Sequence, residues 1–277
     1  MRSDPQACTY HQARKELPPG GLNPHRQTWY HAILPYVEEA ALDDQWNPDQ
    51  FYYENTNRTI PTSPIDLVLC PSDDPTFFDP QSGNPWLSYF RGNYACNVGN
   101  VGVAGTTSWN LTVLPERRLG ATVVENGGQP FVISIDRGFR QHSLGDVLDG
   151  TSHTLAFAEC IQGRPGTSNT GLQDVYGLRG AVFHAAFCWF TTWLTPNSTT
   201  PDRNPDSDGC CVPTPRAPCF SATQLGGPAT LAARSYHSGG VNTCMLDGSV
   251  HFYNDSIDWS VWQALGTTQG GEATAAP

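Results

Sequence analysis

A histidine and an aspartate near the C-terminal end are the residues whose types and spacing best suit chemistry. His237 precedes Asp247 by ten positions, and Gly248 follows directly. Such a pair could transfer protons or bind a metal ion. However, Asp247 and Gly248 separate two β-prone runs and tolerate the backbone angles of a two-residue type I′ turn. The pattern therefore favours a structural role for all three residues, with His237 hydrogen-bonded to backbone across the mouth of a hairpin.

An acidic stretch over residues 202–209 carries oxygen-bearing side chains at alternate positions and ends in a glycine. The four candidate ligands are Asp202, Asn204, Asp206 and Asp208. Calcium prefers roughly six to eight oxygen ligands on a tightly turned loop, so this stretch could supply half of a calcium site. The other half is missing, because Pro215 stands where an EF-hand has a glutamate. The alternative is an acidic surface loop beside two cysteines.

Patterns for catalysis and for glycan binding are weaker. Serine, histidine and aspartate are all present, but no G-x-S-x-G turn is found, and Ser238 precedes two glycines instead. A hydrolase whose site is scattered along the sequence is a third hypothesis. Trp86, Trp109 and Trp193 are candidates for exposed rings that stack on sugars. No catalytic residue is assigned.

Nine cysteines, none of them in a C-x-x-C pair, argue against a zinc cluster. They favour an exported protein with several disulfides and at least one thiol left over, since nine is odd. The first eight residues have no apolar core. We therefore expect a leader peptide either to lie upstream of this sequence or to have been removed.

The composition excludes two classes of partner. A formal net charge of −11 opposes binding to the phosphates of nucleic acids. No run of 18 apolar residues exists, so no segment of the sequence is expected to span a membrane. The 27 glycines and 23 prolines favour short elements joined by loops.

The elements that must position these residues follow an α+β order, with helices first and strands after them. Helical spacing of apolar residues predicts a helix over 29–44, in which Pro35 either introduces a kink or begins a second helix at its first turn. The whole chain, residues 1–277, is expected to form one domain. The predicted strands lie over 65–70, 153–159 and 181–193, the hairpin over 241–253, a short helix over 256–265 and a loop insertion over 196–228.

Several short motifs occur in a fixed order along the chain. They are Leu17-Pro-Pro-Gly20, Trp29 with Leu34-Pro-Tyr-Val-Glu38, Leu69-Cys-Pro-Ser-Asp73, Asn93-Tyr-Ala95, Asp149-Gly-Thr-Ser-His-Thr154 with Glu159, and the segment from His237 to Val250. In this order they resemble a family of planctomycete surface proteins with a prepilin-type N-terminus and a C-terminal H-x9-D-G motif. The function of that family is unknown, although it is also described as solute-binding-like.

The resemblance implies a pilin-like head, in which N-terminal helices pack on an antiparallel sheet. Such a protein would be extracytoplasmic, in the periplasm or at the cell surface. It would meet the membrane only through an N-terminal apolar helix, which is not found in this sequence. Its partners would be other pilin-like subunits in a type IV pilus or type II secretion assembly. The leading hypothesis is therefore a non-catalytic structural protein, and the alternative is a module that binds a glycan or another solute, with calcium as a stabilising ion.

Overall fold

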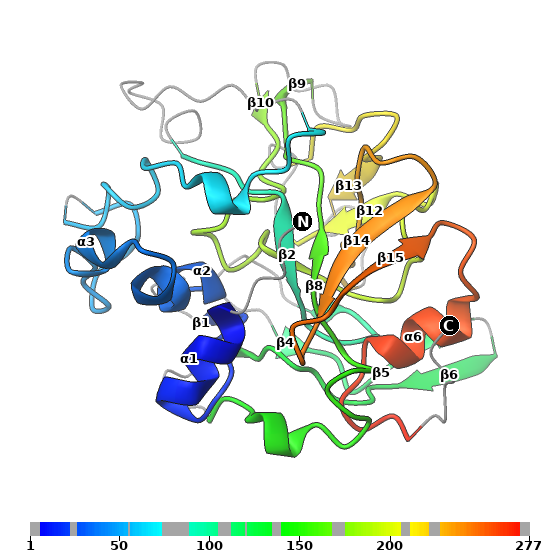
Figure 1. The fold of residues 1–277 in the computed structure, drawn as a ribbon. Coiled ribbons are helices and arrows are strands. Elements are labelled where there is room, and N and C mark those ends of the chain that lie inside the picture. Colours follow the sequence, from blue (N-terminus) through cyan, green and yellow to red (C-terminus); the bar gives the residue numbers. More distant parts are fainter. Residues whose placement is uncertain are drawn as a thin grey trace.

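A mixed five-stranded sheet forms the centre of the computed structural model, with helices and short strand pairs around it (Figure 1). The structure describes residues 6–22, 27–54, 56–73, 89–104, 112–119, 121–134, 140–167, 175–205, 211–221 and 228–271. This is the α+β, loop-rich fold that the order of elements predicts. Within the described ranges, none of the helices has the length and apolar character needed to cross a bilayer.

The central sheet has the strand order β11-β2-β8-β14-β15. β11 pairs parallel to β2, and the other neighbours are antiparallel. The inner strands β2 and β8 are largely buried, because other elements cover both faces of the sheet there. The five strands are β11 (Trp189–Phe190), β2 (Tyr94–Asn97), β8 (Leu155–Glu159), β14 (Gly240–Met245) and β15 (Val250–Asn254).

Five two-stranded pairs lie around the central sheet. Two of them are parallel and three are antiparallel. They join β1 (Gly21–Leu22) to β7 (Ile133–Ser134), β3 (Val103–Ala104) to β4 (Thr112–Val113), β5 (Glu116–Leu119) to β6 (Thr122–Glu125), β9 (Pro165–Gly166) to β10 (Val175–Tyr176), and β12 (Asp202–Asn204) to β13 (Cys219–Ser221).

The predicted C-terminal hairpin is confirmed as β14 and β15, one residue longer at each end. Its turn differs from the two-residue type I′ turn. The Gly248 N–H donates to the Met245 carbonyl at 3.0 Å, and the Met245 N–H donates to the Ser249 carbonyl at 2.9 Å. Gly248 alone takes a positive φ, of 87°, so the connection is a three-residue loop with its left-handed residue at glycine. Asp247 accepts hydrogen bonds from the Ser249 N–H and hydroxyl inside this loop.

The predicted helix over 29–44 is broken into three pieces: α2 (Trp29–Ile33), the 3-10 helix η1 (Leu34–Tyr36) and α3 (Ala40–Asp43). Pro35 explains the break, because it has no N–H to continue the α-helical ladder and suits the first turn of a new helix. A further helix, α1 (Gln6–Arg14), precedes them. The strand predicted over 65–70 was wrong, since it is the 3-10 helix η2 (Asp66–Val68).

The last helix, α6 (Trp259–Leu265), begins three residues later than predicted. The Asp258 carboxylate explains the start, because it caps the N–H groups of Ser260 and Val261. The indole of Trp262 donates to the Leu194 carbonyl at 2.9 Å, which ties α6 to the chain after β11. One more single-turn element, the 3-10 helix η3 (Leu144–Asp146), lies between β7 and β8.

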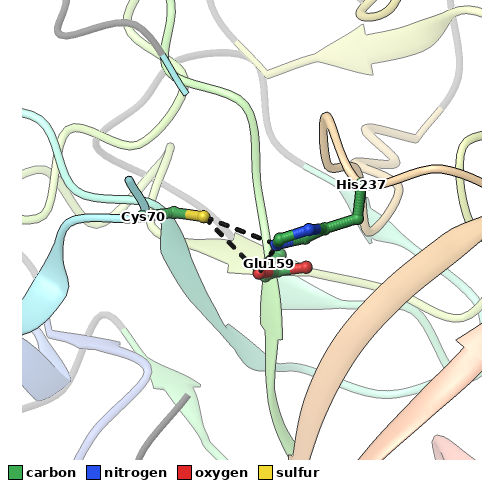
Figure 2. A group of neighbouring side chains, drawn as sticks. All are labelled: Cys70, Glu159 and His237. Atoms are coloured by element: carbon green, nitrogen blue, oxygen red, sulfur yellow. Dashed lines mark hydrogen bonds and ion pairs between the residues drawn. The ribbon is translucent and has the colours of Figure 1, made fainter. Parts of the chain in front are cut away.

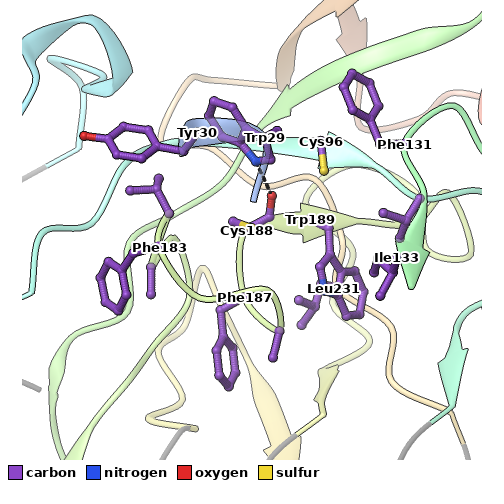
Figure 3. Close-up of a cluster of buried hydrophobic side chains, with 14 of the residues drawn as sticks. Trp29, Tyr30, Cys96, Phe131, Ile133, Phe183, Phe187, Cys188, Trp189 and Leu231 are labelled. Atoms are coloured by element: carbon purple, nitrogen blue, oxygen red, sulfur yellow. Dashed lines mark hydrogen bonds between the residues drawn. The ribbon is translucent and has the colours of Figure 1, made fainter. Parts of the chain in front are cut away.

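The main hydrophobic core lies where α2 and the segment over 181–190 meet the sheet (Figure 3). Trp29 and Trp189 are both buried, and the indole of Trp29 donates to the Cys188 carbonyl at 2.9 Å. The strand prediction over 181–193 is confirmed only for Trp189–Phe190, because 181–188 form turns and 191–193 lie beyond the end of β11. A continuous run of apolar residues indicates burial, but it does not distinguish a buried strand from a buried segment of turns or helix.

The insertion over 196–228 is tied to the body of the protein. Asp202 in β12 forms a buried ion pair with Arg234, with 2.8 Å between the guanidinium and the carboxylate. A disulfide joins Cys211 to Cys219 at the start of β13. The expectation of several disulfides is not met by the other described cysteines, because five of them form no disulfide and four of these are buried. The five are Cys70, Cys96, Cys160, Cys188 and Cys244.

One buried histidine makes stability depend on pH. Burial lowers the pKa of His31 to about 3, and its ring stacks against Trp46. The unfolded chain therefore takes up a proton at the ordinary pKa of about 6.5, whereas the folded chain stays neutral. Stability is complete above that pH and falls as the pH drops toward 3. We expect the free energy of unfolding to be about 2 kcal/mol lower at pH 5 than at pH 7. Urea unfolding over this range measures it. His31→Gln, which has no titrating group, should flatten the slope, and an unchanged slope would contradict the prediction.

Candidate functional site

A cavity of about 430 Å³ opens beside the central sheet, where η2 and the loop after it face β8, β14 and β15. Most of its wall is apolar, and the polar groups gather at one end. This volume lies within the range of roughly 300–1,000 Å³ that is typical of small-molecule sites. The apolar wall consists of Trp29, Leu67, Val68, Leu69, Pro71, Tyr94, Phe157, Cys244 and Val250.

Three side chains from distant parts of the chain converge at the polar end (Figure 2). The His237 Nε2 lies 3.1 Å from the Glu159 Oε1. The Cys70 Sγ lies 3.7 Å from the same carboxylate oxygen and 3.6 Å from the same ring nitrogen. A sulfur, a nitrogen and an oxygen thus form one small triangle, and among the described residues this is the cluster of three groups that could hold a metal ion.

The position of Cys70 is set by a buried amide. Its N–H donates to the Asn93 Oδ1 at 3.0 Å, and the Asn93 N–H donates to the Val68 carbonyl at 2.7 Å. The Asn93 Nδ2 in turn donates to the buried Asp73 carboxylate at 2.7 Å. Asp73 also forms an ion pair with Arg164, beyond the end of β8. The Cys70 loop is therefore fixed against β2 and β8 by side chains at both of its ends.

Glu159 ends β8 and is 2% exposed. Its Oε2 accepts from the Asn242 N–H at 2.8 Å, and its Oε1 accepts from the Asn242 Nδ2 at 3.2 Å. Among the described residues, the ion pair found for this carboxylate is with His237, which is charged only when protonated. A buried carboxylate without a permanent cation is costly, so hydrogen bonds from the neighbouring strand stabilise it.

His237 lies in the loop that leads into β14, with a third of its side chain exposed. Its N–H donates to the Ser235 hydroxyl at 3.1 Å, and that hydroxyl donates to the Gly240 carbonyl at 2.7 Å. The Ser235 N–H is held by the Asn197 side chain at 2.8 Å. These hydrogen bonds fix the backbone of the loop, and the His237 imidazole extends from it toward Glu159 at the end of β8.

The geometry opposes nucleophilic catalysis by Cys70. Burial, with a smaller contribution from the charge of Glu159, raises the pKa of its thiol. At neutral pH the thiol is therefore protonated and a weak nucleophile. In a cysteine–histidine–acid relay, the base uses one ring nitrogen for the thiol and the other for the acid. Here Cys70 and Glu159 both approach Nε2 of His237.

The three residues of the H-x9-D-G motif do not form one site. His237 and Asp247 lie at opposite ends of β14, and Asp247 and Gly248 belong to the turn after it. The expected hydrogen bond from the His237 ring to backbone across the hairpin mouth is replaced by the contact with Glu159. The sheet register explains this, because β8 lies directly beside β14 and ends where the His237 loop begins.

The candidate calcium ligands are also separated in their roles. Asp202 receives three guanidinium contacts from Arg234 and the Ala232 N–H, so its oxygens are not presented to a cation. Asn204 is buried in β12, while Asp206 and Asp208 lie outside the described residues. The partner that the structure gives Asp202 is a buried arginine more than thirty positions away, which local spacing does not indicate.

Of the three tryptophans predicted as candidates for sugar stacking, the structure describes one. Trp193 is 8% exposed and packs edge-on against Trp259. Its ring is therefore part of the structure and was wrongly expected to be exposed. Trp86 and Trp109 lie outside the described residues.

Sequence reasoning did not assign Cys70 and Glu159 to any site. Cys70 is 89 positions from Glu159 and 167 positions from His237, so no local spacing brings them together. The one signal was indirect: all three occur in the short motifs that carry the family resemblance.

The comparisons with known proteins agree with that resemblance at the level of the family. A family model described as a protein of unknown function, DUF1559, matches residues 7–260. No curated protein matches the chain. No solved structure matches it either.

Proposed function

The chain belongs to the DUF1559 family of unknown function, and we propose that it is a non-catalytic, extracytoplasmic module that binds a small solute in the cavity beside η2 and β14. The single observation that carries the proposal is the cavity itself, about 430 Å³ of mostly apolar wall with its polar groups at one end. Such a shape suits a ligand with an apolar body and one polar end group. The disulfide between Cys211 and Cys219 supports a location outside the cytoplasm.

A neutral apolar dye, N-phenyl-1-naphthylamine, tests the cavity directly. We expect a saturable rise in its fluorescence at one dye per chain. Val250→Trp places an indole in the cavity wall and should weaken the dye by at least about tenfold, or roughly 1.4 kcal/mol. The matched control is Val123→Trp, because Val123 is 39% exposed in β6, away from the cavity. Equal loss in both variants, or no saturable binding by the unmodified protein, would contradict the proposal.

The pilin-like assembly role is the second candidate function. It is supported by β15, which is one of the two edge strands of the sheet and leaves about half of Phe252 exposed. Edge strands with apolar side chains can pair with another chain. In that role the protein acts by contact with other pilin-like subunits at the cell surface, and the cavity has no ligand to bind. Absence of dye binding would make this the better account.

A further inference from the structure

We propose that Cys70, Glu159 and His237 bind one divalent transition-metal ion of the zinc class, with its fourth position open to the cavity. The inference rests on the proposed solute-binding function and deepens it, because a donor atom on the solute would fill that position. Binding displaces the thiol proton of Cys70 to solvent and forms a metal–thiolate bond. The carboxylate and the neutral imidazole each donate a lone pair.

The distances between the three side-chain atoms fit one face of a tetrahedron around zinc. Zinc bonds of roughly 2.3 Å to sulfur, 2.0–2.1 Å to nitrogen and 2.0–2.2 Å to oxygen give edges of about 3.6 Å from sulfur and about 3.4 Å between nitrogen and oxygen. The observed separations are 3.7 and 3.6 Å from the Cys70 Sγ and 3.1 Å between Glu159 and His237. All three atoms lie close enough for one ion to contact them together.

The direction of the side chains favours an ion over a hydrogen-bond relay. Nε2 of His237 has one position for a proton or a lone pair, yet the Cys70 Sγ and the Glu159 Oε1 both lie near it (Figure 2). A metal ion between the three atoms uses that single lone pair and satisfies all three groups at once. The buried Glu159 carboxylate has no ion pair with a described arginine or lysine. The metal ion would supply the permanent positive charge that is missing there.

The donor set indicates which ion and which kind of site. A thiolate and an imidazole select zinc-like ions over calcium and magnesium, which prefer oxygen alone. Three protein ligands with an open position are typical of sites that exchange a water or a substrate, whereas structural zinc sites have four. Asn242 holds both oxygens of Glu159 from the neighbouring strand, as outer partners of metal ligands do.

Zinc titration of the chelator-treated protein tests the site, with 4-(2-pyridylazo)resorcinol as the competing chromophore. We expect one tightly bound zinc per chain. Because loss of an outer partner alone typically costs 10–100-fold in affinity, Cys70→Ser and His237→Gln should each cost at least about 100-fold. The matched control is Cys244→Ala, which removes a thiol from the same cavity wall outside the cluster. It should bind zinc like the unmodified protein.

Cobalt provides a readout that a folding defect does not imitate. We expect a thiolate-to-cobalt charge-transfer band in the unmodified protein and in Cys244→Ala, and no such band in Cys70→Ser. Circular dichroism melts without metal establish that each variant is folded. No stoichiometric zinc in the unmodified protein, unchanged zinc affinity in Cys70→Ser, or a cobalt spectrum without the band would each overturn the metal site. Dye binding without zinc binding would contradict the metal site alone. Zinc binding without dye binding would contradict the proposed solute.

Discussion

Replacing Arg234 by methionine lowers the free energy of unfolding by about 3–5 kcal/mol, as expected when one partner of a buried ion pair is removed. The guanidinium is 1% exposed and lies 2.8 Å from the Asp202 carboxylate. It also donates to the carbonyls of Ser198 at 2.7 Å and Thr200 at 3.0 Å. Methionine fills much of the same volume but leaves the carboxylate and these carbonyls without their donor, and urea unfolding measures the loss.

The double variant Arg234→Met/Asp202→Asn identifies the cause. An asparagine at position 202 removes the uncompensated charge and still accepts the Ala232 N–H, so the double variant should be more stable than Arg234→Met alone. If the stability lost by the double variant equals the sum of the losses in Arg234→Met and Asp202→Asn, then packing, and not charge, accounts for the effect. In either case, Arg234, three residues before His237, fixes the start of the 196–228 insertion through Ser198, Thr200 and Asp202, and sequence patterns predicted this stretch only as a loop.

Local patterns predicted the parts of the fold that depend on neighbours in sequence. The alternation of β14 and β15 and the glycine at 248 are sufficient for a hairpin, because its contacts join residues a few positions apart. The start of α6 was misplaced because serine and aspartate favour the cap position about equally. Asp258 is the residue that caps the helix, and Ser256 instead donates to the Asn254 side chain. The apolar run over 65–70 was predicted as a strand, but it forms η2, and none of the strands in the described part of the chain pairs with it.

The site was not predicted, for a physical reason. The Cys70 loop, the end of β8 and the loop before β14 meet only because β2, β8 and β14 are neighbours in the sheet. Strand order follows from packing of the whole domain, and a single sequence carries little direct information about it. Residue types alone suggested Asp247 as one possible partner of His237, but the hairpin pattern favoured a hydrogen bond from His237 to backbone. The register places Glu159 there instead.

Replacing Trp29 by alanine should lower the free energy of unfolding by about 3–5 kcal/mol, the usual cost of deleting a large aromatic side chain from a core. Trp29 is 2% exposed, and its ring meets Phe157 edge-on with 5.0 Å between the centroids. The residue belongs to the main core and also lines the cavity. The matched variant is Trp29→Phe, which keeps an aromatic ring and loses the hydrogen bond to the Cys188 carbonyl. The lost hydrogen bond should lower the free energy of unfolding by only about 1 kcal/mol, in addition to the effect of the smaller side chain.

Urea unfolding of the two Trp29 variants, with and without the dye, connects stability to binding. A ligand that binds only the folded protein stabilises it by RT ln(1 + c/Kd) at a free ligand concentration c, so tighter binding gives a larger stabilisation at the same dye concentration. Trp29→Ala removes the wall that the ligand contacts, so the dye should stabilise this variant less than it stabilises Trp29→Phe. Equal stabilisation by the dye in both variants would place its binding site elsewhere. Because one indole serves the core and the cavity, a substitution there changes both quantities together, whereas Arg234→Met should change stability and leave dye affinity as it is.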